Sequence, residues 1–268
     1  MLDLDKKPSK LLDDFLGEYT KDNDIDINHA KDLIELGLKQ YDSAPYQKFL
    51  ENQWYESLKT SRANFDLYNH NYYFTDLWVC WVMYSRGYIR SILKHNSLNE
   101  NNSIFSMLKN INTVADLGCG LGLTTASLKN LFPNANVIGT NLHGTKQYFF
   151  CEKIADDFGF IVKDNYRDLP EIDLLFASEY FEHIHDCLDE ILDLIENQQP
   201  KYLYLANSFN TTSYGHFQYY KGCRDGSSIH EKDISRKFNK LLRDNDYSKI
   251  KTKLWNNKPM LWKKNNLI

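Results

Sequence analysis

The sequence has 268 residues, of which 42% are hydrophobic and 25% are charged, and its formal net charge is −4. This is the composition of an ordinary globular protein, and the length suits one large α/β domain. The small net charge argues against an overall electrostatic attraction to nucleic acid or to an anionic membrane.

Local charge and cysteine spacing refine this picture. Residues 1–60 carry thirteen acids and eight lysines, whereas the residues from Arg224 to the end carry twelve Lys and Arg and five acids. This basic end could meet a phosphate-bearing partner.

Five scattered cysteines without metal-type spacing predict reduced thiols and no zinc site. The charged first thirty residues predict no secretion signal, and Phe74–Leu93 is too interrupted by charges to span a bilayer. We expect a cytoplasmic protein without a membrane partner.

The sequence up to about residue 108 predicts mostly helices. Within it, Tyr73–His95 places large apolar side chains three and four residues apart, which is typical of one buried helical face. Trp54 and Trp78 fit a core better than a ligand site. We therefore expect a helical N-terminal extension, or lid, over residues 1–108.

From residue 112 onward, short apolar runs alternate with longer helical patterns. This alternation predicts a parallel sheet built from βαβ units. The expected strands are Val114–Leu117, Ala135–Gly139, Phe160–Val162, Ile172–Ala177 and Tyr202–Ala206, and the expected helices cover residues 123–131, 144–157 and 185–197.

The C-terminal end predicts one more helix and two antiparallel strands. Ser228–Glu231 has the pattern of a capping box that opens a helix to about Arg243. The runs Lys249–Trp255 and Met260–Lys263 predict a closing hairpin. The expected fold is α/β: a seven-stranded, mostly parallel, doubly wound sheet closed by an antiparallel C-terminal hairpin. Residues 109–268 would form this Rossmann-like domain.

The most informative segment is Val114–Gly122, a strand that runs into a glycine-rich turn and then a helix. Gly118, Gly120 and Gly122 permit positive φ angles and let the backbone approach a ligand. A dinucleotide-binding loop would need a third glycine at position 123, where leucine stands, and the Gly-Lys-Ser/Thr ending of a phosphate-binding loop is missing.

This segment resembles the first motif of class I S-adenosylmethionine (SAM)-dependent methyltransferases, an acidic residue and a hydrophobe followed by G-x-G-x-G. The resemblance covers about residues 110–265 and implies SAM as the cofactor. It implies that the loop Gly118–Gly122, with Cys119, passes under the methionine part of SAM, and that Asp116 organises its amino acid end.

Later positions agree with the same resemblance, with one departure. The family places an acidic residue on the ribose hydroxyls after the second strand, but this chain has Asn141, followed by Leu142. An amide oxygen can still accept a hydrogen bond without the assistance of charge. The resemblance places Asp164 at the adenine amino group and Asn165 beside it.

The segment Ser178–Ile184 follows the fourth strand, where ligands of open α/β sheets bind. It resembles the post-strand motif of small-molecule methyltransferases, which assigns Ser178 and Glu179 to the cofactor. Two motifs are missing here: the Asn/Asp-Pro-Pro-aromatic tetrapeptide of enzymes that methylate amino groups of DNA, and the Pro-Cys nucleophile of cytosine-C5 enzymes.

Methyl transfer to a hydroxyl needs a base that removes its proton. The candidates are His216, His183 and Glu182, with His216 favoured because it lies in a polar, aromatic segment after the fifth strand. That segment also contains Asn207, Asn210, Tyr214 and Tyr219 and suits a sugar-like acceptor. Arg86 is a candidate partner for the carboxylate of SAM.

The leading hypothesis is therefore a SAM-dependent O-methyltransferase that acts on a polar small molecule. Two alternatives stay open. The basic end favours methylation of a nucleic acid or nucleotide, and Asn141 is compatible with a non-catalytic module that binds the cofactor.

Overall fold

A computed structural model describes residues 26–40, 44–60, 62–80, 110–250 and 260–265, together with the single positions 17, 21 and 108. Its centre is a seven-stranded sheet with the strand order β3-β2-β1-β4-β5-β9-β8. The first five of these strands are parallel, and β9 runs antiparallel to both β5 and β8. The strands of this sheet are β1 (Thr113–Leu117), β2 (Asn136–Thr140), β3 (Ile161–Lys163), β4 (Leu174–Ser178), β5 (Tyr202–Ala206), β8 (Tyr247–Ile250) and β9 (Met260–Lys264).

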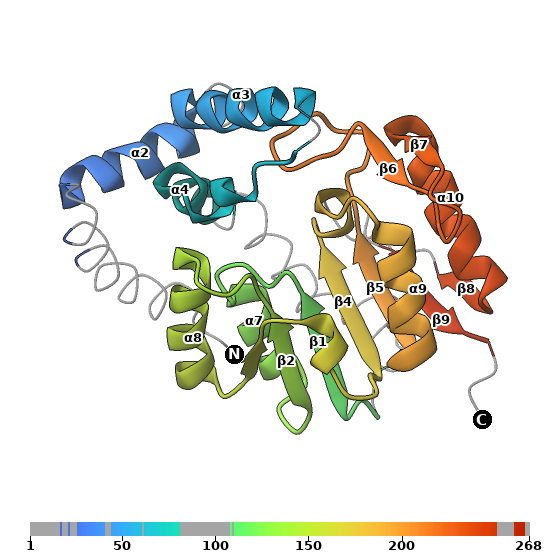
Figure 1. Ribbon diagram of the computed structural model, residues 1–268. Coiled ribbons are helices and arrows are strands. Elements are labelled where there is room, and N and C mark those ends of the chain that lie inside the picture. Colours follow the sequence, from blue (N-terminus) through green and yellow to red (C-terminus); the bar gives the residue numbers. More distant parts are fainter. Residues whose placement is uncertain are drawn as a thin grey trace.

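Helices connect the parallel strands and cover both faces of the sheet (Figure 1). The connecting helices are α7 (Leu123–Leu131), α8 (Lys146–Phe158), α9 (Cys187–Asn197) and α10 (Glu231–Asp244), with short 3₁₀ turns η4 (Tyr166–Asp168) and η5 (Phe181–His183). A small separate hairpin pairs β6 (Tyr219–Lys221) with β7 (Ser228–His230).

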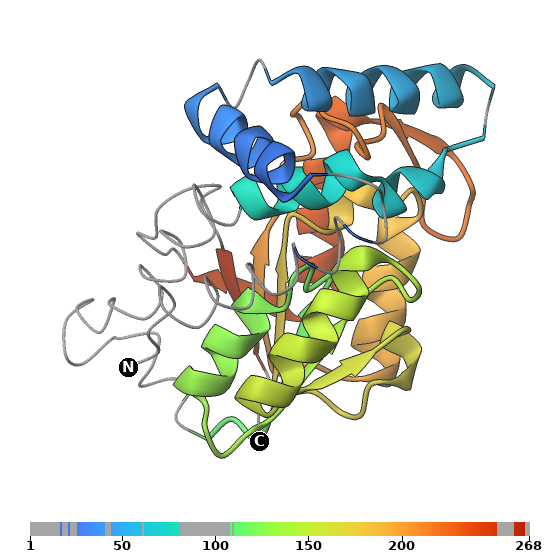
Figure 2. The same cartoon turned by 90° about the vertical axis from the view of Figure 1, so that its left-hand side faces the viewer.

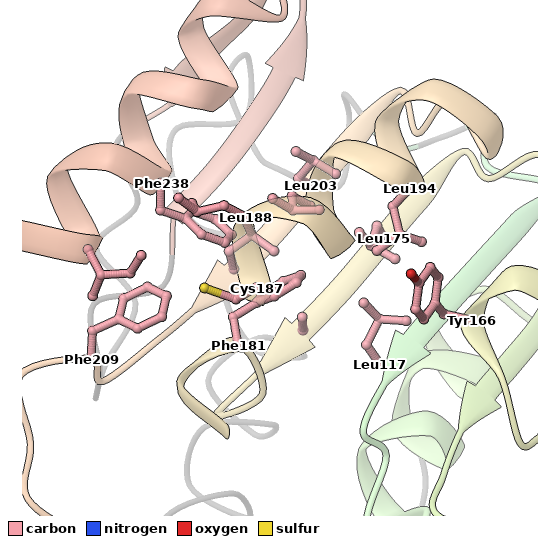
Figure 3. Close-up of a cluster of buried hydrophobic side chains, with 14 of the residues drawn as sticks. Leu117, Tyr166, Leu175, Phe181, Cys187, Leu188, Leu194, Leu203, Phe209 and Phe238 are labelled. Atoms are coloured by element: carbon pink, nitrogen blue, oxygen red, sulfur yellow. The ribbon is translucent and has the colours of Figure 1, made fainter. Parts of the chain in front are cut away.

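Two hydrophobic cores lie on opposite faces of the sheet, because side chains alternate along each strand. On β1, Val114 belongs to the core against α7 and α8, whereas Ala115 and Leu117 belong to the core against α9 and α10. Figure 3 shows part of the second core, in which Phe181, Phe209 and Phe238 lie together beside Cys187 and Leu188. A parallel sheet buried on both faces explains why its strands read as continuous apolar runs.

The N-terminal helices lie across one end of this sheet (Figures 1 and 2). They are α2 (Ile27–Lys39), α3 (Pro45–Lys59) and α4 (Asn71–Cys80), with the 3₁₀ turn η2 (Phe65–Asn69) before α4. Their buried residues belong to the two cores of the sheet. Trp78 is part of the core against α7 and α8, and Trp54 is part of the core against α9 and α10. Among the described residues, no helix is long and apolar enough to cross a membrane.

The predicted strands and helices of the parallel sheet are confirmed, with ends within two residues of the expected ones. The capping box at Ser228–Glu231 is wrong: Ser228 begins β7, and the cap of α10 is His230, whose Nδ1 accepts a hydrogen bond from the Lys232 amide at 3.2 Å. The predicted helix Tyr73–His95 is observed as α4 up to Cys80, and its remainder lies outside the described residues, as do residues 251–259 of the closing hairpin.

Asp173 ties the starts of three neighbouring strands together. Its Oδ2 accepts hydrogen bonds from the amides of Asn112 and Thr113 at 2.6 and 3.1 Å, and its Oδ1 pairs with Lys201 Nζ at 2.6 Å. Burial alone would raise the pKa of Asp173, but the hydrogen bonds from Lys201, Asn112 and Thr113 outweigh it, so the pKa is lowered.

Replacing Asp173 with alanine is expected to reduce the free energy of unfolding by about 2–3 kcal/mol at pH 7, because two backbone amides and a lysine lose a charged acceptor. A lowered pKa in the folded state stabilises the fold above the ordinary Asp value of about 4 and loses this effect as the pH falls below it. Urea unfolding at pH 7 and pH 3 measures both effects, and the difference between wild type and variant should shrink at pH 3.

Asp244→Ala is the matched control, since Asp244 pairs with Lys240 on the exposed face of α10. It should change the free energy of unfolding by less than about 0.5 kcal/mol. Equal effects of the two substitutions would contradict the assigned role of Asp173.

Candidate active site

The glycine-rich loop connects β1 to α7 with three backbone positions in the left-handed region. Gly118, Gly120 and Gly122 have φ angles of 63°, 55° and 80°, which side chains of L-residues rarely adopt. A Cβ on Gly118 would lie 2.4 Å from Cδ2 of Tyr180, so the loop also needs glycine for space there. The loop thus presents bare backbone at the carboxyl end of β1, beside the ring of Tyr180.

Asp116 lies on β1 directly before this loop. It is 2% exposed, and its Oδ2 accepts a hydrogen bond from Thr125 Oγ1 on α7 at 2.7 Å. Burial raises the pKa of Asp116 to about 7, although the Thr125 hydrogen bond acts in the opposite direction. Cys119 is also buried, and its Sγ lies 3.5 Å from Cys151 Sγ on α8.

Asn141 follows β2 and is bonded to the glycine loop. Its Nδ2 donates to the Gly120 carbonyl at 2.7 Å, and its Oδ1 accepts from the Leu142 amide at 2.9 Å. An aspartate here could not donate to a carbonyl, so the amide at position 141 has a local reason. Leu142 is 48% exposed and offers an apolar surface next to it.

Asp164 and Asn165 follow β3 at the same end of the sheet. Asp164 Oδ1 accepts a hydrogen bond from Tyr148 OH at 2.9 Å and lies 3.4 Å from His143 Nδ1, while more than half of its side chain stays exposed. Asn165 Oδ1 caps η4 by accepting from the Arg167 amide at 3.0 Å. Asp164 thus combines an exposed carboxylate with two polar neighbours.

The turn after β4 brings two carboxyl groups together. Glu179 has a positive φ of 52°, and its Oε1 accepts from Ser208 Oγ at 3.2 Å. Glu182 is fully buried, and its Oε1 accepts from the Ser208 amide at 2.8 Å. Burial and the neighbouring Glu179 raise the pKa of Glu182 well above its ordinary value. Ser178, which ends β4, is half-buried.

His183 and His216 meet edge to face above the ends of β4 and β5. Their ring centroids are 4.7 Å apart at an interplanar angle of 85°. His216 Nδ1 lies 2.7 Å from the Thr211 carbonyl, which only accepts hydrogen bonds, so Nδ1 carries the proton and Nε2 keeps its lone pair. His183 Nδ1 lies 3.2 Å from Tyr68 OH.

The surroundings of both imidazoles lower their pKa values. Burial lowers the pKa of His216, and burial together with the neighbouring His216 holds the pKa of His183 well below its ordinary value. Gly215, with a φ of 81°, leaves room for this pair, because a Cβ there would lie 2.4 Å from His183 Nδ1 and 2.6 Å from Tyr68 OH.

The N-terminal helices fix the segment that carries His216. Trp54 Nε1 donates to the His216 carbonyl at 2.8 Å, and Tyr55 OH donates to the Ser213 carbonyl at 3.0 Å. Tyr214 OH donates to the buried Asp76, which also accepts from Gln47 Nε2 at 2.7 Å. The N-terminal region thus forms one wall of the histidine site.

The structure therefore gathers most of the predicted site residues at one end of the sheet, after β1, β2, β3, β4 and β5. Arg86 lies outside the described residues. Of the segment expected to meet the acceptor, Tyr214 is buried against Asp76, whereas Tyr219 is 54% exposed on β6. The sequence analysis did not predict Tyr68 or Thr125 as site residues. Thr125 lies nine residues after Asp116, on the helix that follows the glycine-rich loop, and this spacing could have indicated its contact with Asp116. No local sequence pattern indicates the contact of Tyr68 with His183.

Three basic side chains of the C-terminal end pair with nearby acids. Arg236 pairs with Asp233 at 2.9 Å, Arg224 pairs with Glu196 at 2.6 Å, and Lys240 pairs with Asp244. Pairing of this kind reduces the field that a phosphate-bearing partner would meet.

Solved structures with the same fold are methyltransferases. An O-methyltransferase family protein from Burkholderia thailandensis is 12% identical, with a TM-score of 0.51 over 82% of this chain and 69% of its own. PigF, solved with S-adenosylhomocysteine (SAH), is 12% identical, with a TM-score of 0.52 over 85% of this chain and 73% of its own. No protein-family model and no curated protein matches the sequence. The chain has the class I SAM-dependent methyltransferase fold.

Proposed function

We propose that this protein is a SAM-dependent methyltransferase that methylates a hydroxyl group of a polar small molecule, with His216 as the base. The observation that carries this proposal is the bond of His216 Nδ1 to the Thr211 carbonyl, which leaves the lone pair on Nε2, and burial lowers the pKa of this imidazole. The fold supports SAM as the cofactor, because solved methyltransferases share it.

The residues at the carboxyl end of the sheet fit SAM. Gly120 leaves its backbone uncovered, as the approach of a ligand requires, since the nearest atom to an added Cβ is Leu77 Cδ2 at 3.9 Å. Leu142 offers an exposed apolar surface and Asp164 an exposed carboxylate for the adenosine end. Among the described residues, Asn141 Oδ1 accepts one hydrogen bond, from the Leu142 amide, and its second lone pair would accept from a ribose hydroxyl. Asp116 lies where the amino acid end would be organised.

When bound, SAM supplies a methyl group attached to a positively charged sulfur. His216 Nε2 would take the proton of the acceptor hydroxyl while the oxygen bonds to the methyl carbon and the bond from that carbon to sulfur breaks, which leaves SAH. Thr211 holds the proton-bearing Nδ1 of His216 and so keeps Nε2 as the acceptor. His183 acts as a positioning residue because its ring packs against His216, and Tyr68 acts through His183, to which its hydroxyl is bonded. Glu182 positions the Ser208 backbone rather than serving as the base.

The walls of the histidine site support one class of acceptor. Tyr68 packs edge to face against Tyr73 with centroids 4.9 Å apart, and Tyr73 packs against Tyr214 in the same way. Aromatic faces next to polar groups suit a ring that carries several hydroxyls. We therefore favour a sugar-like acceptor.

The test is a screen of monosaccharides, polyols, phenols and nucleosides with SAM and the full-length protein, in which release of SAH is measured. Turnover with a hydroxylated small molecule, and its loss in His216→Asn, is the expected result. SAM binding without turnover on any acceptor would contradict catalysis and favour a module that only binds the cofactor.

The pH dependence of turnover gives a separate prediction. A base must be neutral to accept a proton, and burial lowers the pKa of His216 from its ordinary value. Activity should therefore persist as the pH falls to about 6.5, the ordinary histidine pKa, and decline only below it. SAH release measured from pH 5 to pH 8 tests this, with thermal unfolding at each pH as the control. A midpoint above pH 6.5 would contradict the assignment.

A further inference from the structure

The first turn of α8 is fixed against the loop that follows β2. Thr145 caps this helix: its Oγ1 accepts a hydrogen bond from the Tyr148 amide at 3.3 Å and donates to the Leu142 carbonyl at 2.7 Å. These two bonds set the position of Tyr148 relative to Leu142, which the proposed function places at the adenosine end of SAM. The proposed function itself gives Tyr148 no role.

The hydroxyl of Tyr148 reaches the loop after β3 and donates to Asp164 Oδ1 at 2.9 Å. Tyr148 is 9% exposed, whereas more than half of the Asp164 side chain is exposed. Burial and the hydrogen bond to Asp164 raise the pKa of Tyr148 to about 12, so its hydroxyl keeps its proton and remains a donor. A buried side chain thus holds one oxygen of an accessible carboxylate.

Both neighbours of the Asp164 carboxylate contact the same oxygen. His143 Nδ1 lies 3.4 Å from Oδ1, and the His143 ring packs edge to face against the Tyr148 ring with centroids 4.9 Å apart. Among the described residues, none bonds to Asp164 Oδ2. The arrangement therefore leaves Oδ2 for a ligand.

An oxygen of this kind has a specific requirement, because an ionised carboxylate only accepts hydrogen bonds. The exocyclic amino group of adenine is a donor. The oxo group that replaces it in hypoxanthine is an acceptor and would face the carboxylate without a bond. A site whose polar group is left unpaired by the wrong ligand rejects that ligand strongly. A carboxylate that is held in place can therefore distinguish these two purines.

We infer that Tyr148 is a positioning residue that gives the cofactor site its selectivity for adenine over an oxo-substituted purine. It acts through Asp164: its bond to Oδ1 holds the carboxylate so that Oδ2 accepts from the exocyclic amino group. His143 supports the same arrangement by packing against the Tyr148 ring. The inference rests on the proposed function, which places the adenosine end of SAM at Asp164.

The test compares SAH with S-inosylhomocysteine, in which an oxo group replaces the amino group of adenine. Calorimetric titration of the full chain should show at least about tenfold tighter binding of SAH. Tyr148→Phe removes only the hydroxyl and should weaken SAH binding about fivefold, the usual effect of one lost hydrogen bond. The affinity for S-inosylhomocysteine should not change, because that ligand makes no bond to Oδ2. The selectivity should fall accordingly.

Tyr247→Phe is the matched control. Tyr247 is also buried, and its hydroxyl donates to the Pro200 carbonyl, but it lies on β8, at the opposite edge of the sheet from β3. It should change neither affinity.

Asp164→Asn gives a second readout of the same arrangement. An amide can keep its oxygen on the Tyr148 hydroxyl and donate from its nitrogen to an oxo group. This variant should bind SAH more weakly and S-inosylhomocysteine more tightly, so that the preference for SAH falls at least about tenfold. Adding Tyr148→Phe to it should then weaken the binding of S-inosylhomocysteine.

Three results would overturn this inference alone. They are equal affinities of the unmodified protein for the two ligands, an unchanged SAH affinity in Tyr148→Phe, and an equal loss of both ligands in that variant. Thermal unfolding shows that each variant is folded. No binding of SAH to the unmodified protein would overturn the proposed cofactor as well, which distinguishes the two failures.

Discussion

Replacing Gly118 with alanine is expected to weaken the binding of SAM and SAH at least about 100-fold, or about 2.8 kcal/mol. The φ of Gly118 is 63°, and an alanine Cβ would lie 2.4 Å from the Tyr180 ring. The substitution therefore strains the loop and pushes a ring out of place where the cofactor is proposed to pass. Calorimetric titration of both ligands measures the change.

Gly144→Ala is the matched control, because Gly144 has a φ of 75° but no atom within 4 Å of its added Cβ. It carries the backbone strain alone and should leave SAH affinity within about threefold, or 0.65 kcal/mol. Thermal unfolding shows whether either variant has lost its fold. An unchanged SAH affinity in a folded Gly118→Ala protein would place the cofactor elsewhere.

Replacing His216 with asparagine is expected to lower kcat about 10²- to 10⁴-fold, the usual contribution of general base catalysis. The asparagine amide can still donate to the Thr211 carbonyl, as His216 Nδ1 does, but it has no counterpart of Nε2. The loop should therefore keep its shape while the base is lost. SAH affinity should remain unchanged, which separates this effect from damage to the cofactor site.

His29→Ala provides the control, since His29 is exposed on α2. It should not affect kcat. If His216→Asn keeps more than about a third of wild-type kcat, the base is not His216. A large loss in His183→Asn in that case would move the role to His183, whose ring contacts His216.

The parallel sheet could be predicted from the sequence because each strand is buried on both faces. A run such as Tyr202–Ala206 contains few polar residues and is bounded by turn residues, so both its presence and its ends are readable. The small hairpin of β6 and β7 could not be predicted, because its strands are three residues long and lie among Gly, Ser and Asp residues. His230 caps α10 from within that hairpin.

The candidate site could be predicted only where it follows the strand ends. The resemblance assigns Asp116, Asn141 and Asp164 to the cofactor, and each lies at or just after the carboxyl end of a parallel strand. Tyr68 reaches His183 across 115 positions of sequence, and Trp54 reaches His216 across 162. Contacts of this kind depend on how the N-terminal helices dock, which no local pattern encodes.

The role of Asn141 illustrates the same limit. In the sequence it is a departure from the resemblance, because an acidic residue is expected at this position. In the structure its Nδ2 holds the Gly120 carbonyl at 2.7 Å, a bond that a carboxylate could not make. Asn141, which departs from the family's pattern, thus stabilises the glycine-rich loop, which agrees with that pattern.

Calorimetric titration of the unmodified protein with SAH tests the central claim most directly. We expect one site per chain with a Kd in the micromolar range, about −8 kcal/mol. The absence of any binding heat at millimolar SAH, with the protein folded, would contradict a SAM-dependent activity and leave the fold without its proposed cofactor.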